Sequence, residues 1–201
     1  MNKNARGTLA IISGPSGVGK STVIAEVLRR RPDLYFSVSF TTRAPRPGEV
    51  DGVNYHFVTV PEFERMIRDG ELLEHARYSE NYYGTSAKLI DEKLDQGIDV
   101  LLDIEVVGSK IVHDLRPDTP LMFVIPPSFE VLEQRLRGRN TDSDEVIRRR
   151  LDRAKEELKE IYRYDYLIVN DVVENAAEEI LAILRAESCR TANRAHLLKE
   201  D

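Results

Sequence analysis

Short apolar runs recur along the chain and alternate with segments whose apolar residues follow a helical spacing. Because these runs are nearly continuous in apolar residues, they are typical of strands that are covered on both faces of a parallel sheet. The segment KSTVIAEVLRR (20–30) is an example of the helical pattern between them. The alternation predicts an α/β fold, in which helices cover an open parallel sheet. The predicted strands are TLAIIS (8–13), DVLLDI (99–104), PLMFVI (120–125) and YDYLIVN (164–170).

Two segments interrupt this alternation. Residues 35–94 contain aromatic-rich strands of alternating polarity, such as NYHFVTV (54–60), with Pro- and Gly-containing turns at 45–52. This segment is typical of a small mixed α+β insertion. Residues 135–155 form the second interruption, and they carry six arginines between positions 135 and 150.

Helical patterns occupy the last third of the chain. One helix is expected to begin after a cap at Thr141 or Ser143 and to bury an apolar stripe. A second long helical pattern extends from about residue 174 to residue 198 and ends in a polar tail. The apolar stripe of the first helix consists of Ile147, Leu151, Ala154, Leu158 and Ile161.

Composition and charge argue against nucleic-acid binding and against insertion into a membrane. The length of 201 residues suits one domain with insertions. A net charge of −6, from 29 basic and 35 acidic residues, argues against non-specific binding of nucleic acid. Cys189 is the only cysteine, and the longest apolar runs are too short to cross a bilayer. We therefore expect a cytoplasmic protein that binds neither nucleic acid nor membranes, and the sequence leaves formation of a homo-oligomer open.

A glycine-rich segment, GPSGVGKST (14–22), follows the first predicted strand directly. Its spacing, Gly-x-x-x-x-Gly-Lys-Ser, matches the Walker A pattern. In that pattern, glycines let backbone N–H groups turn toward phosphates, and the following helix directs its positive end at them. Lys20 supplies a charge for the β- and γ-phosphates, and Ser21 supplies a hydroxyl for Mg²⁺. The motif predicts a P-loop nucleotide binder and leaves transporter ATPases, GTPases and small kinases open.

Two groups of arginines narrow this choice. One group lies in TTRAPRPGE (41–49) and the other at 135–150, and two anionic partners would explain both. If the acceptor is itself a phosphate, its attacking oxygen is already ionised, so catalysis needs positioning and charge neutralisation rather than a general base. The simpler alternatives are a solvated helix face for the second group and a surface turn for the first. Pro45 and Pro47 would stiffen that turn into a clamp.

Further blocks of sequence are more specific than the phosphate loop alone. They are ISGPSGVGKST, SFTTRAPRPGEVDGVNYHFV, ENYYGTS, LLDIE, IPPS, RLRGR, RRRL and LIVND. In kind and order they resemble the blocks of guanylate kinases of the small bacterial type, and the resemblance extends from about residue 8 to residue 190. The resemblance implies transfer of a phosphoryl group from MgATP to GMP, which yields ADP and GDP.

The resemblance also implies three parts of the chain. The core comprises residues 1–38, 95–134 and 156–201, the last with a C-terminal helix. A mixed α+β GMP-binding insertion comprises residues 39–94. A mobile helical lid comprises residues 135–155.

Roles for individual residues follow from the same resemblance. The residues expected to bind ATP are Gly14, Pro15, Ser16, Gly17, Val18, Gly19, Lys20, Ser21 and Thr22, with Asn170 beside the adenine. Arg43, Arg46, Tyr55 and Tyr83 would hold the phosphate of GMP, and Ser39, Glu74, Thr85 and Glu105 would hold its guanine. The expected catalytic residues are Lys20, Arg43, Arg135, Arg139 and Arg150. Ser21 would bind Mg²⁺, and Asp103 would contact it through water.

The assignment of guanine to Glu74 has a physical basis. The Watson–Crick edge of guanine presents N1–H and N2–H₂ as donors, and one carboxylate accepts from both. Adenine places an acceptor at N1 and would repel the same carboxylate, which is a strong form of discrimination. Two positions depart from the family: Glu105 stands where aspartate is frequent, and Val107 where glutamine is frequent. We expect a weaker or rearranged contact with the guanine amino group and selectivity through Glu74.

Three alternatives remain beside this interpretation. A P-loop kinase for a ribose phosphate would lack the guanine-binding set. A non-catalytic guanylate-kinase-like binding module would have lost a working phosphate loop, whereas Lys20 and Ser21 are present here. A GTPase switch would carry an NKxD motif, which this sequence lacks.

Overall fold

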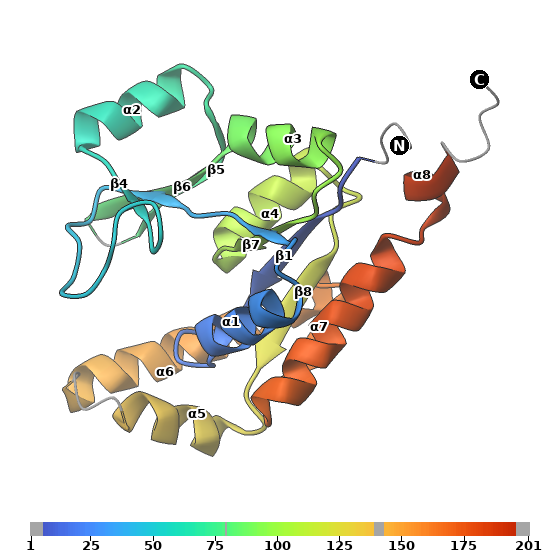
Figure 1. Ribbon diagram of the computed structural model, residues 1–201. Coiled ribbons are helices and arrows are strands. Elements are labelled where there is room, and N and C mark those ends of the chain that lie inside the picture. The colour runs from blue at the N-terminus through green and yellow to red at the C-terminus, as the bar shows by residue number, and fades with distance from the viewer. Residues whose placement is uncertain (1–5, 79, 139–142, 196–201) are drawn as a thin grey trace.

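The computed structural model describes residues 6–78, 80–138 and 143–195, and the core of this part is a five-stranded parallel sheet (Figure 1). The strands lie in the order β2, β7, β1, β8, β9, and every neighbouring pair is parallel. β1 is therefore central, and the loop that follows it opens at the carboxyl edge of the sheet, where ligands of such folds bind. The strands are β1 (Leu9–Ser13), β2 (Tyr35–Phe36), β7 (Val100–Asp103), β8 (Leu121–Ile125) and β9 (Tyr166–Val169).

Helices cover both faces of this sheet because alternate residues of a strand point to opposite faces. Ala10 and Ile12 of β1 belong to an apolar cluster with residues of α1, α5, α6 and α7. Leu9 and Ile11 belong to a second cluster with residues of α3 and α4. The helices are α1 (Lys20–Arg30), α3 (Ala87–Asp95), α4 (Val106–Leu115), α5 (Phe129–Arg137), α6 (Asp144–Leu158) and α7 (Val173–Glu187).

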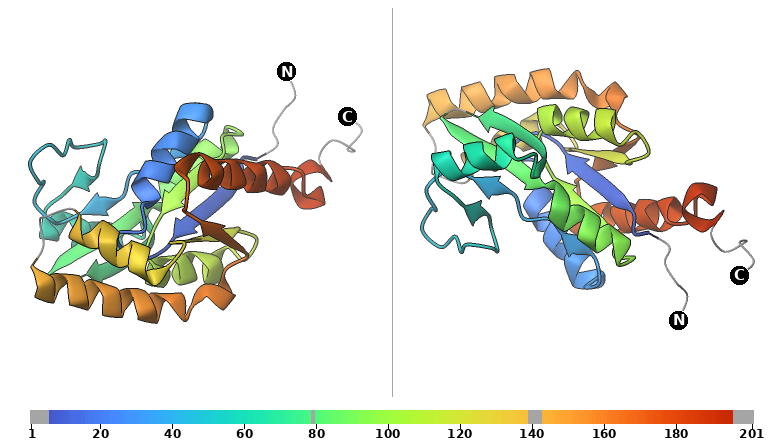
Figure 2. Two further views of the ribbon diagram at one scale, coloured as in Figure 1. Left: turned by 90° about the horizontal axis from the view of Figure 1, so that it is seen from below. Right: turned by 90° about the horizontal axis from the view of Figure 1, so that it is seen from above.

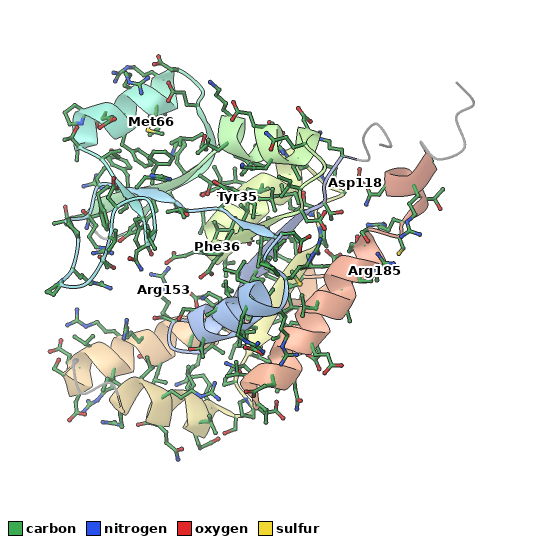
Figure 3. The ribbon with its side chains drawn as sticks, in the orientation of Figure 1. Tyr35, Phe36, Met66, Asp118, Arg153 and Arg185 are labelled. Atoms are coloured by element: carbon green, nitrogen blue, oxygen red, sulfur yellow. The ribbon has the colours of Figure 1, made fainter. Side chains whose placement is uncertain are left out.

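A second sheet and α2 (Val60–Arg68) form the insertion. The strand order is β4, β3, β6, β5, and the sheet is mixed, since β3 pairs parallel with β4 whereas β6 pairs antiparallel with β3 and β5. α2 buries Phe63 and Met66, the second of which is labelled in Figure 3. The ring of Phe63 stacks on Tyr82 of the sheet. Figures 1 and 2 place this sheet and the N-terminal end of α6 at the same end of the molecule. The strands are β3 (Phe40–Thr41), β4 (His56–Phe57), β5 (Leu72–Tyr78) and β6 (Asn81–Ser86).

The alternation of apolar runs predicted the core correctly. All four predicted runs contain strands of the parallel sheet, and the segment after the glycine-rich loop is α1. The sheet has one further strand, β2, at the start of the segment 35–94, which the alternation assigned to the insertion. That assignment was wrong for Tyr35 and Phe36, because a strand of two residues has no periodicity that the sequence could reveal.

The prediction for α6 was correct at its start and wrong at its end. Ser143 is the N-cap, and its Oγ accepts a hydrogen bond from the amide of Val146 at 3.4 Å. Thr141, the alternative cap, lies outside the described residues. The helix ends at Leu158, so Ile161 lies in a separate 3₁₀ helix, η1 (Ile161–Arg163), rather than on the predicted stripe.

The predicted C-terminal helix is two helices. α7 ends at Glu187, and a short helix, α8 (Thr191–Arg194), follows. Nδ2 of the Asn193 side chain donates to the carbonyl oxygen of Glu187 at 2.9 Å, which helps satisfy an acceptor that a continuing helix would have used. Among the described residues, no helix is both long and apolar enough to span a membrane.

Candidate active site

The glycine-rich loop has the geometry that phosphate binding requires. Gly19 is the N-cap of α1 with a φ of 98°, a conformation that favours glycine. A Cβ atom at this position would lie 2.5 Å from Nδ2 of Asn170, so glycine is also required by space. Because Gly19 has no side chain to cap α1, the first-turn amides are left to a ligand.

Lys20 is held inside the loop that it belongs to. Its Nζ donates a hydrogen bond to the carbonyl oxygen of Gly14 at 2.7 Å and lies 3.9 Å from Oδ1 of Asp103. Asp103 ends β7, next to β1 in the sheet. Burial raises the pKa of Asp103 and Glu105 adds to the increase, whereas Lys20 opposes it. Lys20 and Asp103 therefore place a cation and a carboxyl side by side at the carboxyl edge of the sheet.

Arg135 and Asn170 support the loop from behind. Nη1 of Arg135 donates to the carbonyl oxygen of Val18 at 2.9 Å, and Nη2 donates to that of Asn170 at 2.9 Å. Nδ2 of Asn170 donates to the same Val18 oxygen at 2.8 Å. Within the described part of the chain, the buried Oδ1 of Asn170 has no hydrogen-bond partner. These bonds fix the loop backbone to α5 and to the end of β9.

A cavity of about 290 Å³ lies between the loop, the second sheet and α6. It brings together the loop, the insertion, the segment from Asp103 to Gly108 and α6, which are far apart in the sequence, and it contains both acidic and basic side chains. Its lining comprises Gly14, Ser16, Lys20, Ser39, Arg46, Tyr55, Glu74, Ala76, Tyr83, Asp103, Ile104, Glu105, Val106, Gly108, Arg150, Arg153 and Glu157.

Glu74 is a buried carboxyl in the wall of this cavity. Oγ1 of Thr85, on the neighbouring strand β6, donates a hydrogen bond to its Oε1 at 2.6 Å. Burial raises the pKa of Glu74, and the negative charge of Glu105 raises it further, whereas the Thr85 hydrogen bond lowers it. A Cβ atom at Gly108 would lie only 2.8 Å from Oε2 of Glu74. The absence of a side chain at Gly108 therefore makes room for this carboxylate.

The arginines of the insertion are ordered by a neighbouring carboxylate. Arg43 donates through Nη2 to Oε1 of Glu49 at 2.8 Å, and its guanidinium lies 5.3 Å from the ring centre of Tyr55. Oε2 of Glu49 accepts from the backbone amide of Arg46 at 2.7 Å. This ion pair raises the pKa of Arg43 and lowers that of Glu49. Arg46, Tyr55 and Tyr83 line the cavity beside this pair.

A second ion pair connects α6 to the N-cap residue of α4. Nη2 of Arg153 donates to Oε2 of Glu105 at 2.8 Å, and Nε donates to Oε1 of Glu157 at 2.8 Å. Figure 3 shows Arg153 extending from α6 toward the second sheet. All three residues line the cavity.

The structure gathers most, but not all, of the residues predicted for the site around this cavity. Arg43 and Thr85 contact lining residues, and Arg135 and Asn170 lie behind the loop. Arg139 lies outside the described residues. The predicted residues in the lining are Gly14, Ser16, Lys20, Ser39, Arg46, Tyr55, Glu74, Tyr83, Asp103, Glu105 and Arg150.

Six residues of the cavity lining escaped the sequence analysis: Ala76, Ile104, Val106, Gly108, Arg153 and Glu157. Arg153 and Glu157 follow Arg150 at positions i+3 and i+7 of α6, so the periodicity of one helix face could have found them. Gly108 carries no such signal, because its importance depends on the position of Glu74 in another element.

Comparison with known proteins gives a consistent result. The family model described as guanylate kinase matches residues 6–187. A guanylate kinase from Lactococcus lactis is 51% identical over 185 residues, which cover 92% of this chain and 90% of the relative. One from Streptococcus agalactiae is 52% identical over 187 residues, which cover 92% and 89% of the two chains. The crystal structure of guanylate kinase from Anaplasma phagocytophilum superposes with a TM-score of 0.78 at 34% identity and covers 94% of this chain and 89% of that one.

Proposed function

The chain belongs to the guanylate kinase family, and from that membership we propose how its residues carry out phosphoryl transfer from ATP to GMP. Family membership makes the chain an ATP:GMP phosphotransferase with ADP and GDP as products. The observation that supports these residue roles is that one and the same cavity is lined by Lys20 of the phosphate loop, by Glu74 of the insertion and by Arg150 of α6. Donor and acceptor nucleotides can thus meet in one place.

The transfer needs no general base. An ionised oxygen of the GMP phosphate attacks the γ-phosphorus of ATP while the bond to the β-γ bridging oxygen breaks, and ADP leaves. Positioning and charge neutralisation supply the catalysis. Lys20, already held beside the loop backbone, would bind the β- and γ-phosphates. Arg150 would approach the transferring group from α6, together with Arg139 as the resemblance implies.

GMP would lie with its base and its phosphate at opposite parts of the cavity. The ionised carboxylate of Glu74 would accept from N1–H and N2–H₂ of guanine, with Ser39 and Thr85 beside it. Arg43, Arg46, Tyr55 and Tyr83 would bind the phosphate. The carboxylate–guanine contact explains why adenine nucleotides would be poor acceptors.

The donor set of the loop fits a magnesium ion that is bound with ATP. Mg²⁺ prefers oxygen ligands and is usually held by one or two protein groups together with substrate phosphates and water. Ser21 follows Lys20 in the first turn of α1, and Asp103 lies 3.9 Å from Lys20 Nζ. Among the described residues, no group of three or more His, Cys, Asp or Glu side chains could hold a metal ion. From the family resemblance and these oxygen donors, we assign Ser21 as a direct ligand and Asp103 as a contact through water, and the ion would neutralise phosphate charge.

A coupled assay of ADP release tests this function. MgATP is supplied with GMP, AMP, CMP or UMP in turn, together with a control that lacks an acceptor. We expect activity with GMP alone. Activity with none of these acceptors, in a chain that still binds ATP, would refute the proposal and favour a ribose phosphate acceptor. Because both substrates are cytoplasmic metabolites, we propose that the enzyme works in the cytoplasm.

A further inference from the structure

The contact between Arg153 and Glu105 joins α6 to the part of the cavity where guanine would bind. Glu105 is the N-cap residue of α4, but its carboxylate binds Arg153 rather than an amide of the first turn of α4. The two residues are 48 positions apart, and both line the cavity that contains Glu74. The contact therefore connects two elements that are far apart in the sequence, rather than neighbouring turns of one helix.

The guanidinium of Arg153 is itself oriented before it meets Glu105. Nε donates to Glu157, one helical turn further along α6, and the Glu157 side chain is only 15% exposed. The planar guanidinium places its donors in a fixed fork, so the bond to Glu157 determines where Nη2 points. Nη2 donates a hydrogen bond to Oε2 of Glu105, so that Oε1 of the same carboxylate can accept a hydrogen bond from a ligand.

Charge at the cavity gives this contact a second effect. Glu74, Asp103 and Glu105 all line the cavity, and the charge of Glu105 raises the pKa of both other carboxyls. Arg153 places a positive charge on Glu105 and so offsets part of the negative charge at this part of the lining.

We propose that Arg153 is a positioning residue for guanine recognition, which orients Glu105 from α6 so that Oε1 accepts a hydrogen bond from the 2-amino group. The proposal rests on the proposed function, in which the resemblance already assigns Glu105 to guanine, and it adds that the orientation of this carboxylate depends on Arg153 of α6. Glu105 has one methylene more than aspartate and therefore more side-chain freedom to restrict. Since α6 belongs to the expected lid, the contact also links guanine binding to the position of that helix.

Binding of GMP and IMP, measured by calorimetry, tests the proposal, because IMP lacks the 2-amino group. Arg153→Ala should weaken GMP binding about threefold, the size expected for a partly exposed ion pair, and should leave IMP binding unchanged. In a Glu105→Ala background, Arg153→Ala should have no further effect, since its action would pass through Glu105. Arg153→Lys keeps the charge but loses the fork, so it should fall between wild type and Arg153→Ala.

Arg149→Ala is the matched control. Arg149 also lies on α6 and also pairs with a glutamate, at 2.9 Å from Glu145, but this pair is exposed and lies outside the cavity lining. The Arg149→Ala variant should bind GMP like the wild type. Equal losses for GMP and IMP, an undiminished loss in the Glu105→Ala background, or the same loss in the control would overturn the proposal. A wild-type chain that forms no GDP from ATP and GMP refutes the proposed function itself, which the variant comparison does not test.

Discussion

Gly108 offers a perturbation that should impair GMP binding while it leaves stability nearly unchanged. The residue lies in the first turn of α4, and a Cβ atom there would come within 2.8 Å of Oε2 of Glu74, whereas ordinary van der Waals contact begins at 3.4 Å. Gly108→Ala must therefore displace the Glu74 carboxylate or the helix by about 0.6 Å. Glu74 is buried and bound to Thr85, so it has little room to move away without losing that bond.

The magnitude follows from the hydrogen bonds at stake. Hydrogen bonds to charged groups contribute about 1.5–3 kcal/mol each, so the loss of one guanine contact should raise the KM for GMP by about 10- to 100-fold. Alanine in place of glycine favours a helix by up to about 1 kcal/mol, which offsets part of the steric cost in the free protein. We expect a melting temperature near that of the wild type and an unchanged KM for ATP.

The assay is steady-state kinetics with each substrate varied in turn, beside thermal unfolding of the same preparations. Val107→Ala is the matched control, because it changes the neighbouring position of α4, where the side chain is 61% exposed. The control should keep the wild-type KM for GMP. An unchanged KM for GMP in Gly108→Ala would refute the reasoning, and so would equal losses for ATP and GMP.

Three other predictions concern the loop, the pH dependence and the motion. Lys20→Ala should lower kcat by at least about 10²-fold while thermal unfolding stays near that of the wild type, and wild-type kcat in this variant would contradict the assignment of the loop. Burial raises the pKa of Glu74. As the pH is lowered, protonation of this carboxylate should therefore raise the KM for GMP at a higher pH than protonation of an exposed glutamate would. A Glu74→Gln variant with the same pH profile as the wild type would show that another group titrates. Both nucleotides together should draw the second sheet and α6 closer, because a closed site excludes water from the transfer; small-angle scattering or FRET without compaction would argue against closure.

The features that the sequence predicted correctly depend on short stretches of chain. The apolar runs, the helix after the glycine-rich loop and the Ser143 cap each involve residues that are neighbours in sequence. The Walker A spacing belongs to the same class, because loop and helix are consecutive. The pattern failed where a boundary depends on distant contacts or on very short elements, as at the end of α6 and at β2.

The site was predictable only in part for the same reason. Periodicity and spacing pointed to the loop and to the arginine groups, but Glu74 was one acidic residue among 35 without the family resemblance. The partners of the predicted residues come from other elements: Gly108 makes space for Glu74, and Arg153 binds Glu105 from 48 positions away. No local pattern records such pairs, since they exist only after both sheets and α6 have packed.

The proposed roles of the cavity residues give GMP one direction of binding. Glu74 and Glu105, on β5 and at the start of α4, supply the acceptors, whereas Arg46 comes from the segment that contains the Arg43–Glu49 pair. A nucleotide that entered in reverse would place its phosphate against two carboxylates, where like charges repel and cost several kcal/mol of complementarity. Each half also carries a compensating ion pair, Arg43 with Glu49 and Glu105 with Arg153, so the side chains are oriented before the ligand arrives. Such preorganisation lowers the entropy lost on binding, and it explains why a cavity lined by so many charges can select one acceptor.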